Sequence, residues 1–204
     1  MEDFGLYVII TDPDYPVSKI TEICVKYNVG MLQLREKELC DKELLKTLEL
    51  MLSITKGSST KVVINDRVDL AIASGADGYH LGQDDIPFVN AREVAGNRNL
   101  VCGLSTHSLE QAKEAVKLKP DYIGFGPVYP TFAKKNPDAP VGCDQLKQVL
   151  DLSDCPVVAI GGINRDNISE VLETGAKNIA MIKGLVKSAN IEEEISFYSS
   201  LLAR

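Results

Sequence analysis

The chain has 204 residues, of which 45% are hydrophobic and 25% charged, enough for one sizeable core. Its formal net charge of -7 argues against a nucleic-acid partner, because binding a polyanion requires a basic surface. The first residues include Glu2 and Asp3 instead of a basic leader, and no apolar stretch reaches about 18 residues. We therefore expect one domain over residues 1–204, without export signal or membrane span.

Eight apolar runs of strand length alternate with segments of helical periodicity. The predicted strands are residues 6–11, 31–34, 61–64, 78–81, 100–104, 122–125, 157–160 and 179–182. The predicted helices are residues 18–27, 42–55, 68–74, 88–95, 109–116, 144–150, 168–174 and 191–201. Nearly continuous apolar runs indicate strands buried on both faces, as in a parallel sheet. The pattern predicts an α/β fold, a single-domain (β/α)8 TIM barrel, with a doubly wound open sheet as the alternative.

The cysteines give no sign of disulfides or of a metal site. Their number is odd, and they are widely spaced without a CxxC or Cys/His pattern. The five are Cys24, Cys40, Cys102, Cys143 and Cys155. We expect reduced thiols in a cytoplasmic protein.

The segment after the second predicted strand carries two cations beside an amide. Strand alternation places Gln33, Arg35 and Lys37 on one face. An arginine fork and a lysine point charge suit a phosphate or diphosphate. The alternative is a surface salt-bridge cluster of these cations with Glu36 and Glu38.

Carboxylates follow the third and fourth predicted strands. Asp66 stands beside Asn65, and Asp84 and Asp85 follow the next strand. Neighbouring carboxylates repel each other unless a cation lies between them, and Mg²⁺ accepts one or two carboxylates together with water and phosphate oxygens. The alternative is that these side chains cap the following helices. His80 lies within an apolar run, which favours a position in the barrel interior.

Hydroxyl, glycine and lysine residues follow the later strands. The fifth strand is followed by Ser105, Thr106 and His107. A Ser–His nucleophile is the weaker interpretation of this segment, because capping of the next helix by Ser108 or Thr106 explains most of it. The long connection at residues 131–142 contains Lys134, which either closes over a ligand or is merely solvated. After strands seven and eight come Gly161-Gly162 and Lys183-Gly184, a pattern typical of phosphate binding in barrels.

The chain as a whole resembles the thiamine-phosphate synthase family. The segments that carry the resemblance, in order over nearly the whole chain, are 7–12 (YVIITD), 33–37 (QLREK), 64–66 (IND), 76–85 (ADGYHLGQDD), 103–105 (GLS), 126–131 (GPVYPT) and 159–163 (AIGGI). The resemblance implies a TIM barrel that joins a hydroxymethylpyrimidine diphosphate to a thiazole phosphate with Mg²⁺, releasing pyrophosphate. It implies small-molecule substrates, no nucleic acid and no membrane, and leaves a homo-oligomer open.

The resemblance also assigns roles to individual residues. The pyrimidine diphosphate would meet Gln33, Leu34, Arg35, Glu36, Lys37, Asn65, Ser105 and Lys134. Of these, Arg35, Lys37, Ser105 and Lys134 would act in catalysis. Asp66 and Asp85 would hold Mg²⁺. The thiazole phosphate would meet Thr131, Phe132, Ala133, Gly162, Ile182 and Lys183.

Two positions depart from the family pattern. Ala133 stands where the family typically has a second threonine of a Pro-Thr-x-Thr-Lys motif, and Lys183 stands where it typically has serine. Our hypothesis is that Lys183 supplies the phosphate affinity that Ala133 does not contribute. Two other functions are considered on the same scaffold: a thiazole tautomerase, which would need neither the aspartate pair nor Arg35 and Lys37, and a non-catalytic thiamine-phosphate-binding protein.

Overall fold

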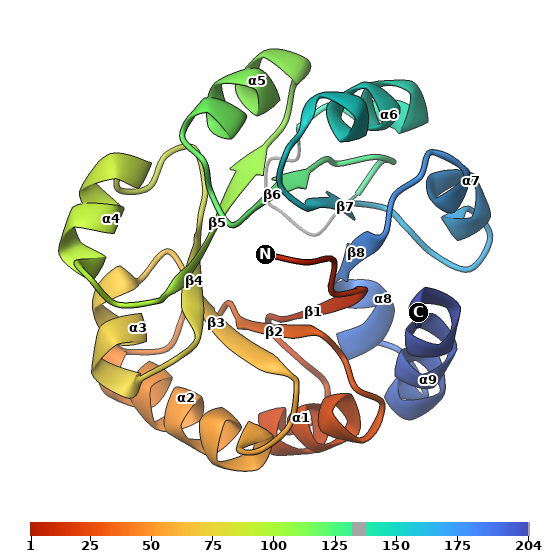
Figure 1. Ribbon diagram of the computed structural model, residues 1–204. Helices are drawn as coiled ribbons and strands as arrows, with labels where there is room; N and C mark the ends of the chain where they lie inside the picture. Colours follow the sequence, from red (N-terminus) through yellow and green to blue (C-terminus); the bar gives the residue numbers. More distant parts are fainter. Residues whose placement is uncertain (132–137, 204) are drawn as a thin grey trace.

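Parallel strands form a closed barrel in which each strand pairs with its neighbours in the sequence and β1 pairs with β8 (Figure 1). The computed structural model describes residues 1–131 and 138–203. The strands are β1 (Leu6–Ile10), β2 (Met31–Leu34), β3 (Lys61–Asn65), β4 (Gly78–Leu81), β5 (Val101–Thr106), β6 (Tyr122–Phe125), β7 (Val157–Ile160) and β8 (Asn178–Met181). The closed barrel confirms the predicted fold and excludes the open sheet.

The helices form a ring outside the barrel (Figure 1). They are α1 (Val17–Lys26), α2 (Asp41–Thr55), α3 (Val68–Ser74), α4 (Phe88–Ala95), α5 (Leu109–Lys117), α6 (Gly142–Leu152), α7 (Ile168–Glu173), α8 (Lys183–Val186) and α9 (Ile191–Leu202). The predicted helices agree to within a few residues at their ends. The short α8 was not expected, because four residues are too few to show a helical period.

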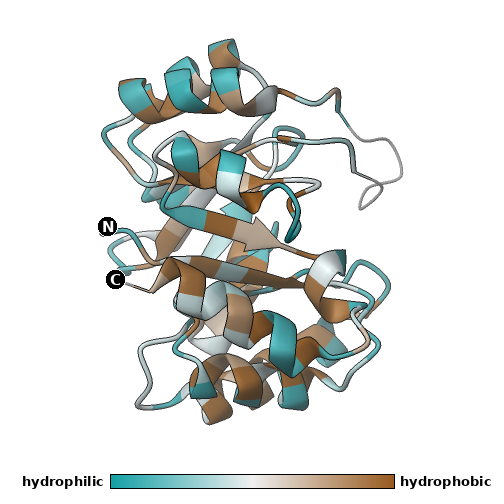
Figure 2. Cartoon of the chain, turned by 90° about the vertical axis from the view of Figure 1, so that its right-hand side faces the viewer, coloured by the Kyte–Doolittle hydropathy of each residue, from teal (hydrophilic) through white to brown (hydrophobic). Residues whose placement is uncertain are grey.

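Each strand is buried on both faces. Val8 and Ile10 of β1 pack outward in the layer between barrel and helices, whereas Tyr7 and Ile9 point inward. Figure 2 shows hydrophobic residues along the central strands and mixed faces on the surrounding helices. This double burial is the physical reason for the continuous apolar runs in the sequence.

The N-terminal residues lie at the amino end of the barrel. The backbone N–H groups of Phe4 and Gly5 donate to Oδ1 of the buried Asn178, at 2.7 and 3.1 Å. The Phe4 ring packs edge-on against Tyr7 and Tyr122. Figure 1 accordingly shows the N-terminus projecting onto the barrel centre.

Across the described part of the chain, none of the helices combines the length and apolar character needed to cross a membrane.

Candidate active site

A cavity of about 360 Å³ opens where the strands end at their carboxyl side. In a parallel barrel the loops that follow the strands meet at this face, so residues far apart in the sequence share one space. Eight residues expected at a substrate site line it: Gln33, Arg35, Asn65, Ser105, Thr131, Gly162, Ile182 and Lys183.

Other expected residues lie elsewhere. The side chain of Leu34 is fully buried between barrel and helices, so only its backbone can face a ligand. Glu36 accepts a hydrogen bond from the backbone N–H of Asp12 at 2.6 Å. Phe132, Ala133 and Lys134 lie outside the described residues.

Arg35 and Lys37 do not form the alternative salt-bridge cluster. Within the described residues neither cation has a carboxylate in salt-bridge distance. Arg35 lines the cavity, and its backbone N–H donates to the carbonyl of Ile10 at 2.9 Å, which extends the β1–β2 ladder by one residue. Positive charge at this edge of the cavity is therefore available to an anionic ligand.

Asp66 and Asp85 form a pair of interacting carboxyl groups. Burial, followed by hydrogen bonding and repulsion from Asp85, raises the pKa of Asp66 from 3.8 to about 6. The charges of Lys37 and Arg35 act in the opposite direction on the same pKa. Two carboxyl groups that crowd each other beside two cations are donors that would suit a hard divalent ion.

The alternative interpretation, that Asp66 and Asp85 cap the following helices, is wrong. The residues at the start of α3 and α4 are Arg67 and Pro87, without a side-chain cap hydrogen bond at either helix. Asp85 instead accepts from the backbone N–H of Gly82 at 2.6 Å, while Asp84 is exposed.

Among residues 1–131 and 138–203, no three or more His, Cys, Asp and Glu side chains lie together so that they could hold a metal, and the Asp66–Asp85 pair is the donor set considered. The residues present fit Mg²⁺, because this ion commonly takes one or two carboxylates and fills its remaining positions with water and substrate phosphate.

A buried chain of hydrogen bonds crosses the barrel interior and ends at Ser105. Gln33 donates to the Tyr7 hydroxyl, which lies 2.8 Å from the Tyr122 hydroxyl. Nδ1 of His80 lies 2.9 Å from Tyr122, and its Nε2 lies 2.8 Å from Oγ of Ser105. Burial raises the pKa of both tyrosines, so they stay neutral donors and acceptors. His80 is thus in the barrel interior as predicted, and it orients Ser105.

The Ser–His pair within residues 105–107, which was the weaker interpretation of the sequence, does not form. Ser105 bonds to His80, whereas Nδ1 of His107 lies 2.6 Å from the carbonyl of Gly126. Ser108 accepts from Gln111 N–H at 3.2 Å and caps α5, which confirms the favoured prediction that Ser108 or Thr106 caps this helix.

Sequence reasoning assigned no role to Tyr7 and Tyr122, whose hydroxyl-bearing side chains line the cavity. A hydroxyl-bearing ring in an otherwise aliphatic strand, at an inward position, was the available signal for the tyrosines. The sequence indicated His107 only as a candidate partner of Ser105; its contact with the carbonyl of Gly126, 19 positions away, depends on the fold.

The ends of β7 and β8 form the opposite wall. Gly161 and Gly162 have positive φ of 99° and 67°, and a Cβ on Gly162 would collide with Tyr129 and Pro130. Glycine is required there because the two loops pass in direct contact. The first residue of α8, Lys183, lines the cavity beside Ile182.

Comparison with known proteins agrees with this geometry. The family profile described as thiamine monophosphate synthase matches residues 6–185. The chain belongs to this family. Thiamine-phosphate synthase of Halalkalibacterium halodurans is 37% identical over 205 residues, covering 99% of this chain and 97% of that one. The protein of the same name from Lawsonia intracellularis is 38% identical, covering 93% and 88%.

A solved structure shares both fold and sequence with the chain. Thiamine phosphate pyrophosphorylase from Pyrococcus furiosus superposes with a TM-score of 0.86 at 33% identity, covering 98% of each chain. A 3-hexulose-6-phosphate synthase structure, with a TM-score of 0.68 at 16% identity, shows the barrel fold alone.

Proposed function

We propose that this chain is a thiamine-phosphate synthase that transfers an aminopyrimidinylmethyl group from its diphosphate to thiazole phosphate. The observation that carries the proposal is the arrangement of one cavity with two chemically different walls. Arg35 and Asn65 line one side, with the Asp66–Asp85 pair and Lys37 just outside the lining, and glycines with Lys183 line the other. Family membership supports the same reaction.

On the first side, Arg35, Lys37 and Lys134 bind the diphosphate, and Gln33, Asn65 and Ser105 orient the pyrimidine. The backbone of Leu34 and the carboxylate of Glu36 shape this edge. When bound, Mg²⁺ supplies positive charge to the diphosphate oxygens, and Asp66 and Asp85 are the side chains that would hold it.

On the second side, the thiazole phosphate meets Gly162, Ile182 and Lys183, together with Thr131, Phe132 and Ala133. Positive φ at the glycines leaves room for close approach of a ligand to the backbone. Lys183 adds a charge where the anion is expected.

The reaction needs charge neutralisation more than proton transfer. The bond between the pyrimidine CH₂ and the diphosphate oxygen breaks, and the bonding pair leaves with pyrophosphate. Arg35 and Lys37 stabilise the negative charge that develops on the leaving group. The thiazole nitrogen then forms the new bond to CH₂ with its own lone pair, so no general base is required. The buried walls of the barrel keep water from the electron-poor CH₂.

The chain acts as one catalytic domain over residues 1–204, in the cytoplasm, on small-molecule substrates.

Pyrophosphate release from both substrates with Mg²⁺ tests the function. Release that requires both substrates supports a synthase, whereas a tautomerase would convert the thiazole phosphate alone and a binding protein would release nothing. An Asp66→Ala variant should lose activity by orders of magnitude, with exposed Asp84→Ala as its matched control. Near-normal turnover of Asp66→Ala would overturn the assignment.

A further inference from the structure

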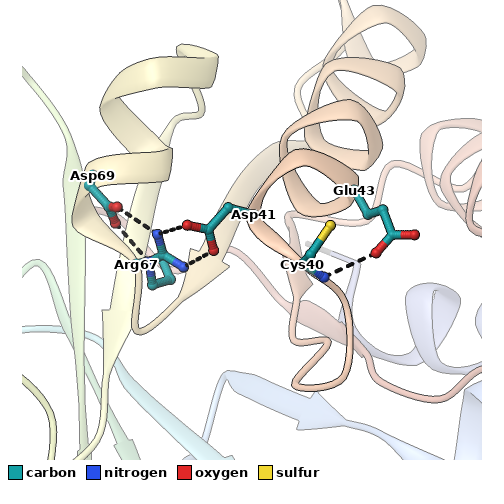
Figure 3. Close-up of polar contacts among 5 residues, drawn as sticks. All are labelled: Cys40, Asp41, Glu43, Arg67 and Asp69. Carbon is teal, nitrogen blue, oxygen red and sulfur yellow. Dashed lines mark hydrogen bonds and ion pairs between the residues drawn. The ribbon is translucent and has the colours of Figure 1, made fainter.

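Arg67 joins two helix starts on the diphosphate side of the cavity. Figure 3 shows its guanidinium between Asp41, the first residue of α2, and Asp69, in the first turn of α3. It donates to Asp41 through Nη1 at 2.5 Å and Nη2 at 3.1 Å. It donates to Asp69 through Nε at 2.9 Å and Nη2 at 2.6 Å. Four hydrogen bonds to two carboxylates fix the guanidinium plane in a way that a single ion pair cannot.

The backbone of Arg67 closes a tight turn around Asp66. Its N–H donates to the carbonyl of Asn65 at 2.8 Å, and Asp66 at the centre of this turn has φ of +65°. A non-glycine residue in this region stores strain, which persists only where the surroundings hold it. The residue that follows Asp66 is therefore fixed at both its backbone and its side chain.

We call Arg67 with Asp41 and Asp69 the clamp. Its Asp41 end holds the loop that carries Arg35 and Lys37. This loop is tied to the barrel where Arg35 N–H donates to Ile10. At α2 it is tied where Glu43 accepts from the N–H of Cys40 at 3.0 Å (Figure 3). Asp41 follows directly and binds Arg67, so the two loops on this side share one rigid connection.

We propose that Arg67 is a positioning residue that sets the distance between Asp66 and the diphosphate-binding cations. It lies outside the cavity lining and touches no reacting group; it acts by coupling the loop after β3 to the start of α2. The inference rests on the proposed function, since the loops it couples are those assigned to the diphosphate and Mg²⁺.

Binding of Mg²⁺ with inorganic pyrophosphate, measured by titration calorimetry, tests the proposal without turnover. Loss of a residue that orients metal ligands typically weakens metal binding about 10- to 100-fold, and we expect this for Arg67→Met. In the full reaction, kcat/KM for the pyrimidine diphosphate should fall by a similar factor, while the KM for thiazole phosphate stays within about twofold. Unchanged pyrophosphate binding by Arg67→Met would overturn the proposal.

Arg92→Met is the matched control. Arg92 has a similar exposed fraction, 38% against 34% for Arg67, and pairs with Asp121 at 2.8 Å near the amino end of β6. Both variants lose an arginine–carboxylate contact, so their melting temperatures should fall to a similar degree. Only Arg67→Met should lose pyrophosphate binding, and an equal loss in Arg92→Met would show a general stability effect.

Two further variants distinguish the hydrogen-bond geometry of Arg67 from its charge, and an effect on binding from a failure to fold. Arg67→Lys keeps the charge without the two planar forks, so it should recover only part of the affinity; full recovery would overturn the clamp. Should Arg67→Met not fold, Asp41→Asn decides by the same titration, because it weakens only the connection to α2. Wild type that binds Mg²⁺ and pyrophosphate but does not join the two substrates would refute the proposed function, while the variants still test the clamp.

Discussion

Replacing Asp66 with asparagine should stabilise the metal-free protein while it abolishes catalysis. Asparagine has nearly the same shape and can donate to Asp85, and it removes the charge that Asp85 repels. The pKa of Asp66 rises from 3.8 to about 6, a difference of about 2, which corresponds to about 3 kcal/mol if fully realised. Because Asp66 is only half-buried, solvent screening reduces the expected gain to about 1–2 kcal/mol.

The sign follows from proton linkage. The native state holds a proton on Asp66 up to about pH 6, whereas the unfolded chain releases it near pH 3.8. The contribution of this group is therefore fully present below pH 3.8 and is lost as the pH rises through about 6. Asp66→Asn keeps a neutral side chain at every pH and should lack this loss.

Urea unfolding in EDTA at pH 5 and pH 7.5 measures the effect. At pH 7.5 we expect the free energy of unfolding of Asp66→Asn to exceed that of the wild type by about 1–2 kcal/mol. This difference should be smaller at pH 5. Asp84→Asn, at an exposed neighbour of the pair, is the control and should show neither change. A variant of Asp66 that is equally or less stable than wild type in EDTA at pH 7.5 would refute the reasoning.

Three further outcomes are expected. Lys183→Ala should raise the KM for thiazole phosphate about tenfold and leave Mg²⁺–pyrophosphate binding unchanged, since a charge-assisted hydrogen bond contributes about 1.5–3 kcal/mol; an unchanged KM contradicts our hypothesis for this residue. Mg²⁺ should raise the melting temperature more at pH 7.5 than at pH 5, because protons compete for Asp66 below about pH 6; equal shifts would argue against this carboxylate as ligand. Gly103→Ala should lose about 1–3 kcal/mol in urea unfolding, because its Cβ would collide with Tyr122 and His80, and a neutral result would contradict the packing of the barrel interior.

The Asp66–Asp85 pair shows how much of the site the local sequence predicts. Asp66 and Asp85 each follow a strand, and parallel strands end at one face, so proximity was predictable from order alone. Their role as helix caps was an equally good local interpretation. Only the structure shows that Arg67 and Pro87 occupy the cap positions and that the two carboxyl groups meet.

In the segment 33–37, the alternation of side chains between the two faces of a strand holds only as far as the strand pairing extends. Gln33 and Arg35 face the cavity, as a strand period predicts, but β2 ends at Leu34 and Lys37 is not part of the lining. Lys37 acts at a distance, through its charge on Asp66. A strand pattern cannot place residues once the chain leaves the ladder.

The sequence by itself determined the barrel, its strand order, the family and the face on which the site lies. Each of these depends on local periodicity and on short motifs at strand ends, which nearby residues carry. The tertiary structure decided which side chains of neighbouring β/α units meet. Ser105 bonds to His80 of β4 and not to His107, and Arg67 connects α2 to the loop of Asp66. These contacts join residues about 25 positions apart, whose distance depends on how the whole barrel closes.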